Sequence, residues 1–160
     1  MPDDEELVAA LEEQERRLQL DAFGPDDAWE LGTLLVELAR ERDLAVTVDV
    51  RRPGHVLFHV ALNGTTPEND AWVERKVRVV ERFHASSYLV GRRLAAKGRT
   101  LGVEQGVDPL LFAAHGGAFP IRVRGVGVVG TVTVSGLAQA DDHALVVEAL
   151  ERLIAAGATS

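Results

Sequence analysis

Hydrophobic residues recur every three or four positions in four long segments of the chain, and this spacing predicts amphipathic helices. A shorter helix or helical turn is predicted to begin near Ser86 and Ser87. The long helices are predicted at residues 4–20, 28–42, 68–84 and 140–154. Residues that favour helix starts accompany three of them, namely Asp26 or Asp27, Thr65 with Glu68, and Asp141 with Asp142.

In segments that separate these helices, apolar and polar residues alternate along the chain. This pattern predicts two hairpins of antiparallel strands. In residues 45–51, three valines are expected to face the core while Thr47, Asp49 and Arg51 face the other way. A Pro-Gly turn joins this strand to residues 55–62. The second hairpin is predicted at residues 119–124 and 127–134. Residues 97–107 are predicted to form a loop, and residues 108–114 cannot be assigned from their periodicity alone.

This order of elements predicts an α+β fold in which helices pack against a mainly antiparallel central sheet of about four or five strands. The chain has 160 residues, of which 46% are hydrophobic, so one core can bury about two-thirds of its unfolded surface. We expect a single domain over residues 1–160, with an N-terminal helix at about 4–20 and a core at about 26–155.

The composition excludes several classes of protein. The sequence has no cysteine, so it contains no disulfide, thiolate nucleophile or zinc-thiolate site. No run of about 18 apolar residues exists to span a bilayer, and the acidic residues 2–6 are unlike a secretory signal. We therefore expect a cytoplasmic protein that does not bind membranes.

The net charge of −8 is unevenly distributed along the chain. Residues 1–43 carry fourteen Asp and Glu against four Arg, whereas residues 74–99 carry eight Arg and Lys against two Glu. An acidic chain is not expected to bind nucleic acid, but the basic segment could hold a small anion. Alternatively, this segment forms a solvated helix face or contacts the acidic N-terminal helix of a neighbouring subunit.

Two glycine-containing motifs resemble known sites without the structural context that those sites need. Residues 125–130 match the dinucleotide pattern G-x-G-x-x-G, but strand-forming residues follow where that site requires a helix. We therefore expect no nucleotide cofactor. The sequence His115-Gly116-Gly117 is like an esterase oxyanion motif, yet no Gly-x-Ser-x-Gly elbow accompanies it.

Histidine is the residue type best suited to acid-base chemistry and to metal binding. His55 and His59 share one face of a strand but lie roughly 13 Å apart at about 3.3 Å per residue, so they cannot hold one metal ion. His143 is expected at the surface of its helix, which leaves His84 and His115 as functional candidates. No metal site is predicted in the protein alone.

Several segments together resemble the small proteins labelled heme-degrading-domain proteins, which are related to the GlcG and HbpS heme-binding group and to the C-terminal domain of PduO-type adenosyltransferases. The resemblance covers roughly residues 20 to 155. The matching residues are Asn69, Trp72, Arg75 and Lys76; Phe83, His84, Ser86, Ser87 and Tyr88; the segment 116–121; the segment 133–137; and Asp141, Asp142 and His143.

The resemblance implies a three-layer α/β/α domain that assembles from dimers into larger rings and binds heme or another tetrapyrrole. One difference affects the glycine loop. The heme-binding relatives usually place one residue between the glycine pair and the proline, whereas Ala118 and Phe119 intervene here. The loop, and any ligand that it holds, is therefore expected to differ from theirs.

Three functions follow as hypotheses. The first is a homo-oligomeric protein that binds a heme-like or other anionic small molecule, with or without heme degradation, in which His84 or His115 reaches the iron. The others are an assembly or adaptor protein without catalysis, and an enzyme acting on a small anionic metabolite. The candidate ligand-binding residues are Asn69, Trp72, Arg75, Lys76, His84, Ser86, Ser87, His115, Gly116, Gly117, Phe119, Pro120, Ser135 and Asp142. No catalytic residue is identified.

Overall fold

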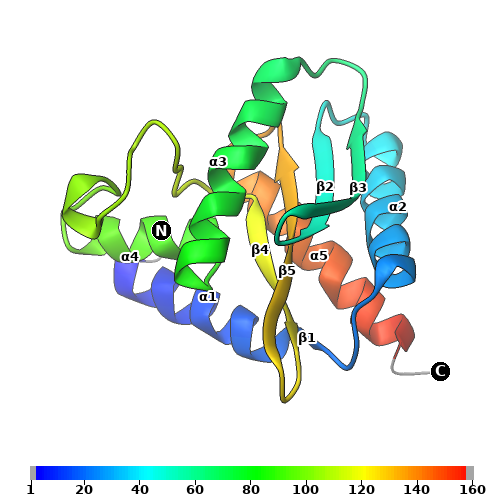
Figure 1. The fold of residues 1–160 in the computed structure, drawn as a ribbon, viewed down its shortest axis with the longest axis horizontal. Coiled ribbons are helices and arrows are strands. Elements are labelled where there is room, and N and C mark those ends of the chain that lie inside the picture. The colour runs from blue at the N-terminus through cyan, green and yellow to red at the C-terminus, as the bar shows by residue number, and fades with distance from the viewer. Residues whose placement is uncertain (1–2, 158–160) are drawn as a thin grey trace.

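A five-stranded sheet forms the centre of the molecule in a computed structural model that describes residues 3–157 (Figure 1). The strands are β1 (Gln19–Leu20), β2 (Thr47–Arg52), β3 (His55–Ala61), β4 (Ala118–Val123) and β5 (Gly127–Ser135). Their order is β1-β4-β5-β2-β3, and every neighbouring pair is antiparallel except β1 with β4. The predicted α+β fold with a mainly antiparallel sheet is therefore confirmed.

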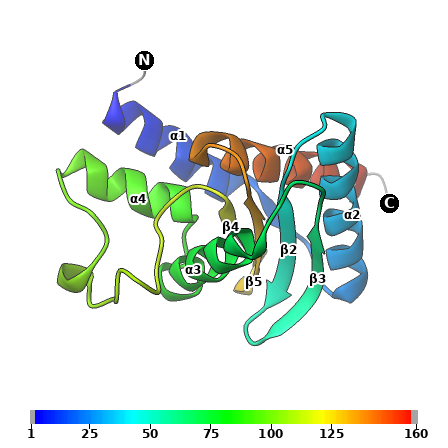
Figure 2. The same ribbon diagram turned by 90° about the horizontal axis from the view of Figure 1, so that it is seen from above.

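Helices cover both faces of this sheet, as the three-layer arrangement requires. The helices are α1 (Asp4–Arg17), α2 (Pro25–Glu41), α3 (Pro67–Phe83), α4 (Ser87–Ala96) and α5 (Gln139–Gly157), with a 3-10 turn at Val103–Gln105. Figure 2 shows α3 on one side of the sheet and α5 on the other. Within residues 3–157, no helix is long and apolar enough to cross a membrane.

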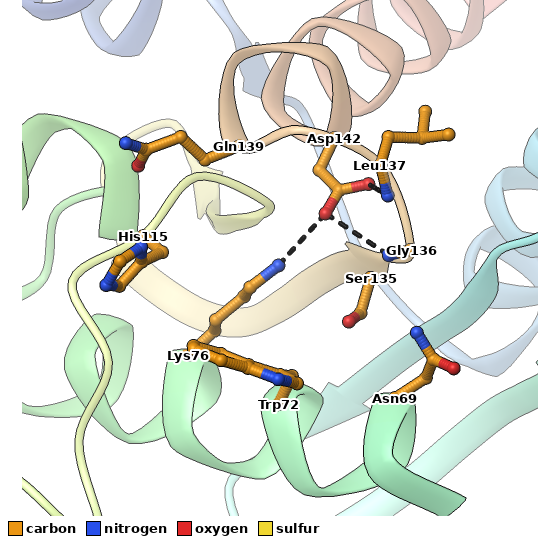
Figure 3. A pocket seen from close by; sticks show the side chains of 9 residues that line it. All are labelled: Asn69, Trp72, Lys76, His115, Ser135, Gly136, Leu137, Gln139 and Asp142. Carbon is orange, nitrogen blue, oxygen red and sulfur yellow. Dashed lines mark hydrogen bonds and ion pairs between the residues drawn. The ribbon is translucent and has the colours of Figure 1, made fainter. Parts of the chain in front are cut away.

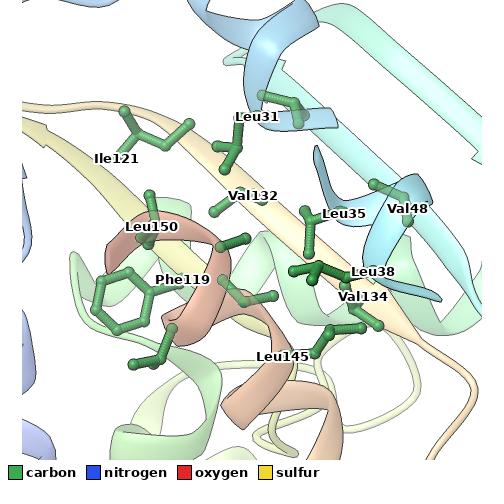
Figure 4. Close-up of a cluster of buried hydrophobic side chains, with 14 of the residues drawn as sticks. Leu31, Leu35, Leu38, Val48, Phe119, Ile121, Val132, Val134, Leu145 and Leu150 are labelled. Carbon is green, nitrogen blue, oxygen red and sulfur yellow. The ribbon is translucent and has the colours of Figure 1, made fainter. Parts of the chain in front are cut away.

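The main hydrophobic core lies between the sheet and the helices α2 and α5 (Figure 4). The valines at 46, 48 and 50 point into it, as their alternation predicted. Phe119 from β4 and Leu31 from α2 are fully buried there. A smaller core joins α1, α3 and α4 around Leu11, Val79 and Leu89.

Helix α1 ends earlier than its hydrophobic spacing predicted. The predicted helix over residues 4–20 stops at Arg17, and the next residues form the short strand β1 beside Arg122 and Val123. Leu18 and Leu20 are both buried in the main core. Pairing with β4 and burial of these two leucines therefore outweigh continuation of the helix.

The cap of α3 lies one residue further along the chain than the sequence pattern predicted. The backbone N–H of Glu68 donates to the hydroxyl of Thr66 at 3.3 Å, and the N–H of Thr66 donates to Asn69 Oδ1 at 2.9 Å. Thr65 instead donates its hydroxyl to the carbonyl of Leu62. This shift places Asn69 in the first turn of α3.

The acidic helix α1 contacts the basic helix α4 of the same chain. Arg93 pairs with Glu12 at 2.7 Å, and Arg92 pairs with Asp4 at 3.3 Å. The sequence had suggested such a contact with a neighbouring subunit. Because these pairs are largely exposed, each is expected to contribute less than about 1 kcal/mol to folding.

A charged network lies between α3 and the β2–β3 hairpin. Asp49 is fully buried and accepts hydrogen bonds from the Arg51 guanidinium at 2.7 and 2.8 Å. His59 lies between Asp49 and Asp70, with each ring nitrogen 2.7 Å from a carboxylate oxygen. Partial burial lowers the pKa of His59, but its hydrogen bonds to the two carboxylates outweigh this effect and raise the pKa above its usual value.

The raised pKa of His59 predicts a pH-dependent stability. Protonated His59 stabilises the fold fully below about pH 6.5, its ordinary pKa, and this contribution is lost as the pH rises through the higher folded-state pKa. Because the side chain is 35% exposed, the contribution is expected to stay below about 1 kcal/mol. Urea unfolding of the wild type and His59→Gln should show a difference that shrinks as the pH rises from about 5.5 to 8.5. A difference that does not change with pH would contradict this account.

Candidate functional site

A cavity of about 280 Å³ lies between α3, the end of β5 and the start of α5 (Figure 3). Asn69, Trp72 and Lys76 line it from α3, where spacings of three and four residues place them on one face of the helix. The other lining residues are His115, Ser135, Gly136, Leu137, Gln139 and Asp142. The lining is therefore rich in polar side chains that carry hydrogen-bond donors and acceptors.

Lys76 and Asp142 form a buried ion pair in the wall of this cavity. The Lys76 ammonium lies 3.1 Å from Asp142 Oδ2 and also donates to the carbonyl of Val134 at 3.2 Å. Asp142 accepts further hydrogen bonds from the backbone N–H groups of Leu137 and Gly136, at 2.9 and 3.3 Å. Burial lowers the pKa of Lys76 and raises that of Asp142, while their mutual attraction opposes both shifts.

His115 lies at the edge of the cavity against Trp72. The two rings meet edge to face with centroids 5.4 Å apart, and the Arg75 guanidinium lies 4.6 Å from the Trp72 ring centroid. Burial lowers the pKa of His115, and the positive charges of Lys76 and Arg75 lower it further. These effects favour the neutral form of the ring. Within residues 3–157, its nitrogens make no hydrogen bond, whereas both ring nitrogens of His59 and the Nε2 atom of His143 do.

The glycine pair after His115 allows the loop to approach α5 and β5 closely. A Cβ atom on Gly116 would lie 2.1 Å from the carbonyl oxygen of Gln139. Gly117 has a φ of 140°, and a Cβ atom there would lie 2.3 Å from the Val134 oxygen and 2.7 Å from the Lys76 ammonium. The side chain of Gln139 accepts a hydrogen bond from the Gly116 N–H at 3.0 Å. Only glycine fits at these two positions.

Six of the candidate residues from the sequence line this one cavity: Asn69, Trp72, Lys76, His115, Ser135 and Asp142. Gly116 and Gly117 shape the loop beside it, and Ser87 accepts a hydrogen bond from the N–H of Ala118 at 3.1 Å. Arg75 lines an adjoining cleft that shares His115 and Gln139 with the cavity.

The structure places the other candidates elsewhere. His84 caps the C-terminal end of α3 in a left-handed conformation and borders a separate cleft near α1. Ser86 caps α4, and its backbone N–H donates to Glu15 at 3.0 Å. Phe119 and Pro120 are buried in β4, and Phe119 belongs to the main core. His84 and His115 therefore do not share one site.

Sequence reasoning missed three lining residues, namely Gly136, Leu137 and Gln139. A usable signal for Gln139 was its position three residues before Asp142, one helical turn away. The expectation for His143 was wrong, since its side chain is buried between Tyr88 and Phe119 and lies 2.7 Å from Gln14 Oε1. Burial lowers the pKa of His143 to about 4.

The glycines that match the G-x-G-x-x-G pattern form the turn between two strands and part of the second strand. Gly125 lies in the middle of the turn between β4 and β5 with a φ of 75°, and Gly127 and Gly130 belong to β5. No helix opens at this point. The motif is therefore a hairpin, as its strand-forming residues predicted.

The chain is similar to known proteins of a described family. The sequence profile of the family described as "Haem degrading protein HbpS-like" matches residues 23–151. A UPF0303 protein of Streptomyces coelicolor is 63% identical over 147 residues, which cover 92% of this chain and 93% of that protein.

Two solved structures share the fold. The Ybr137w protein is 31% identical with a TM-score of 0.86, and the match covers 93% of this chain and 88% of that one. A PduOC structure, described as a complex with heme, is 17% identical with a TM-score of 0.68 over 81% of this chain and 94% of that one. At this identity, the second match shows a common fold.

Proposed function

The chain belongs to the HbpS-like family of haem-degrading proteins, and from this premise we propose that it binds a heme-like or other anionic small molecule in the cavity beside His115. The main supporting observation is the position of His115, which lines the cavity against Trp72 and whose ring nitrogens make no hydrogen bond within the described chain. Nearby positive charge from Arg75 favours an anionic ligand.

The residues around the cavity suit a heme-like group. Histidine is a common axial ligand of heme iron, and His115 is available in the required neutral form. Arg75 donates to the carbonyl of Pro109 at 3.0 Å and forms no ion pair within residues 3–157, so its charge is available to a carboxylate such as a propionate. When bound, heme would supply a redox-active iron, whereas these residues would bind and orient the ligand.

The size of the cavity limits how such a ligand can sit. A volume of about 280 Å³ is at the lower end for small-molecule sites, which typically have about 300–1,000 Å³. A tetrapyrrole would therefore extend out of the cavity, and a second subunit could cover it. Separately from the cavity, Trp29 of α2 is 64% exposed and Val56 of the edge strand β3 is 48% exposed, and such exposed apolar side chains favour self-association at this edge of the sheet.

Titration with hemin tests the proposal. We expect a shifted Soret band for the wild type and an affinity at least about tenfold lower for His115→Ala, because the axial ligand is lost. His84→Ala is the matched control, since His84 lies in a different cleft, and it should stay within about twofold of the wild type. Absence of a Soret shift would disprove heme as the ligand. Equal losses of affinity in the two variants would show that hemin binds nonspecifically and not at His115.

The small polar cavity also favours a second candidate, an enzyme or binding protein for a small anionic metabolite. The buried pair of Lys76 and Asp142 beside Ser135 offers groups that could hold a carboxylate and move a proton. In that case, succinate should raise the pKa of His115 measured by NMR, because a nearby negative charge favours the protonated ring. An unchanged pKa would exclude this candidate.

The assembly or adaptor alternative has less support. It required Ser86, Ser87 and Asp142 to be buried by a neighbouring subunit, but all three are already buried within this chain. Their hydrogen bonds also lie within the chain. These residues therefore do not indicate a partner.

A further inference from the structure

A second cleft, of about 260 Å³, lies between α4, the loop before β4 and the side chain of Arg75. Arg75, Arg92 and Arg99 line it, and none of the described residues that line it is Asp or Glu. In a chain with a net charge of −8, this local excess of arginine is unusual. A site lined by positive charge alone attracts anions.

Most arginines of the basic segment have structural roles, which sets this cleft apart. Arg78 and Arg82 donate to backbone carbonyls of the loop before β4, and Arg93 pairs with Glu12. By contrast, the Arg99 guanidinium makes no hydrogen bond or ion pair within residues 3–157. A charge without an internal partner has no evident structural role and remains available to a ligand.

The other two arginines of the cleft are only partly neutralised. Arg75 donates to a backbone carbonyl and contacts Trp72, so it faces no carboxylate. Arg92 pairs with Asp4, whose side chain is 53% exposed, at 3.3 Å. The Nε atoms of Arg75 and Arg92 are buried without a hydrogen-bond partner. The cleft therefore carries positive charge that no carboxylate in its wall balances, and the Arg99 guanidinium supplies its accessible unpaired donors.

Apolar side chains form another part of the cleft wall. Leu94, Leu101 and Phe112 line it and are partly buried against the smaller core. A ligand that fits this wall would combine an apolar portion with an anionic group. Guanidinium groups suit phosphate, because their planar forks donate two parallel hydrogen bonds to its oxygens.

We propose that this cleft binds a phosphoryl group carried by a small organic molecule with an apolar portion. A phosphate monoester carries about −1.5 to −2 charges at pH 7, which matches two or three arginines better than a single carboxylate does. This cleft adjoins the cavity proposed for the heme-like ligand and shares His115 and Gln139 with it. Arg99 contributes to the cleft but not to the cavity, so it separates the two sites experimentally.

Calorimetric titration with phenyl phosphate and with benzoate, in phosphate-free buffer at constant ionic strength, tests the proposal. We expect phenyl phosphate to bind at least about tenfold more tightly than benzoate, which carries the same ring with less charge. Arg99→Ala should weaken phenyl phosphate binding at least about tenfold, and Arg99→Lys should restore part of it. Because Arg99 is exposed, circular dichroism should show an unchanged fold for both variants.

Arg124→Ala is the matched control, since it removes one positive charge from an exposed residue outside the cleft. This variant should bind phenyl phosphate within about twofold of the wild type. An equal loss in Arg124→Ala, equal affinity for benzoate, or no binding of phenyl phosphate would each overturn the proposal. Hemin titration of Arg99→Ala should match the wild type, so failure of this proposal is distinguishable from failure of the one at His115.

Discussion

Replacing Asp142 with alanine is expected to lower the free energy of unfolding by about 3–5 kcal/mol. The substitution leaves the Lys76 ammonium, whose side chain is only 4% exposed, without its charged partner. It also removes the acceptor for the backbone N–H groups of Gly136 and Leu137. Urea unfolding followed by far-ultraviolet circular dichroism measures the loss.

Two further variants identify the cause of that loss. Asp141→Ala changes an exposed neighbour and should alter stability by no more than about 0.5 kcal/mol. The double variant Lys76→Met/Asp142→Leu replaces both charges with apolar groups and should be more stable than Asp142→Ala alone. A loss of less than about 1 kcal/mol in the free energy of unfolding of Asp142→Ala would contradict a stabilising role for the buried pair between α3 and α5.

Replacing Phe119 with alanine is expected to cost about 3–5 kcal/mol, because it leaves a cavity in the main core. Phe119 has no exposed surface and extends from β4 into the main core beside Leu150 of α5 (Figure 4). Denaturant unfolding gives the value, and Leu110→Ala, at a residue that is 80% exposed, should change stability by no more than about 0.5 kcal/mol.

A conservative variant distinguishes a core role from a ligand-binding role for Phe119. Phe119→Leu should retain much of the stability, since it keeps most of the apolar volume, and should bind hemin like the wild type. A stable Phe119→Ala protein with weakened hemin binding would contradict the assignment of Phe119 to the core. It would instead support the original expectation that Phe119 contacts the ligand.

The sequence predicted best those features that depend on local periodicity. Alternation over residues 45–51 indicated which valines enter the core, because successive side chains of a strand point to opposite faces. Helical spacing likewise predicted the helix over residues 68–84, which the structure has as α3 (Pro67–Phe83). Strand β1 has only two residues, Gln19 and Leu20, which is too short for any period to be read.

Long-range contacts account for what the sequence did not predict. Lys76 and Asp142 are 66 residues apart, and no local pattern indicates that they pair. Phe119 stands beside the glycine loop in sequence, yet its place in β4 directs it toward the main core. His143 is buried because α1 supplies Gln14 as a partner from 129 residues away.

Native mass spectrometry of the protein purified from its own host tests the central claim most directly. The wild type should carry a heme-like or other anionic small molecule, and this added mass should be absent from His115→Ala. The same spectrum reports the number of subunits to which the ligand is bound. A wild-type protein with no bound small molecule, or an added mass that survives unchanged in His115→Ala, would contradict the proposed site.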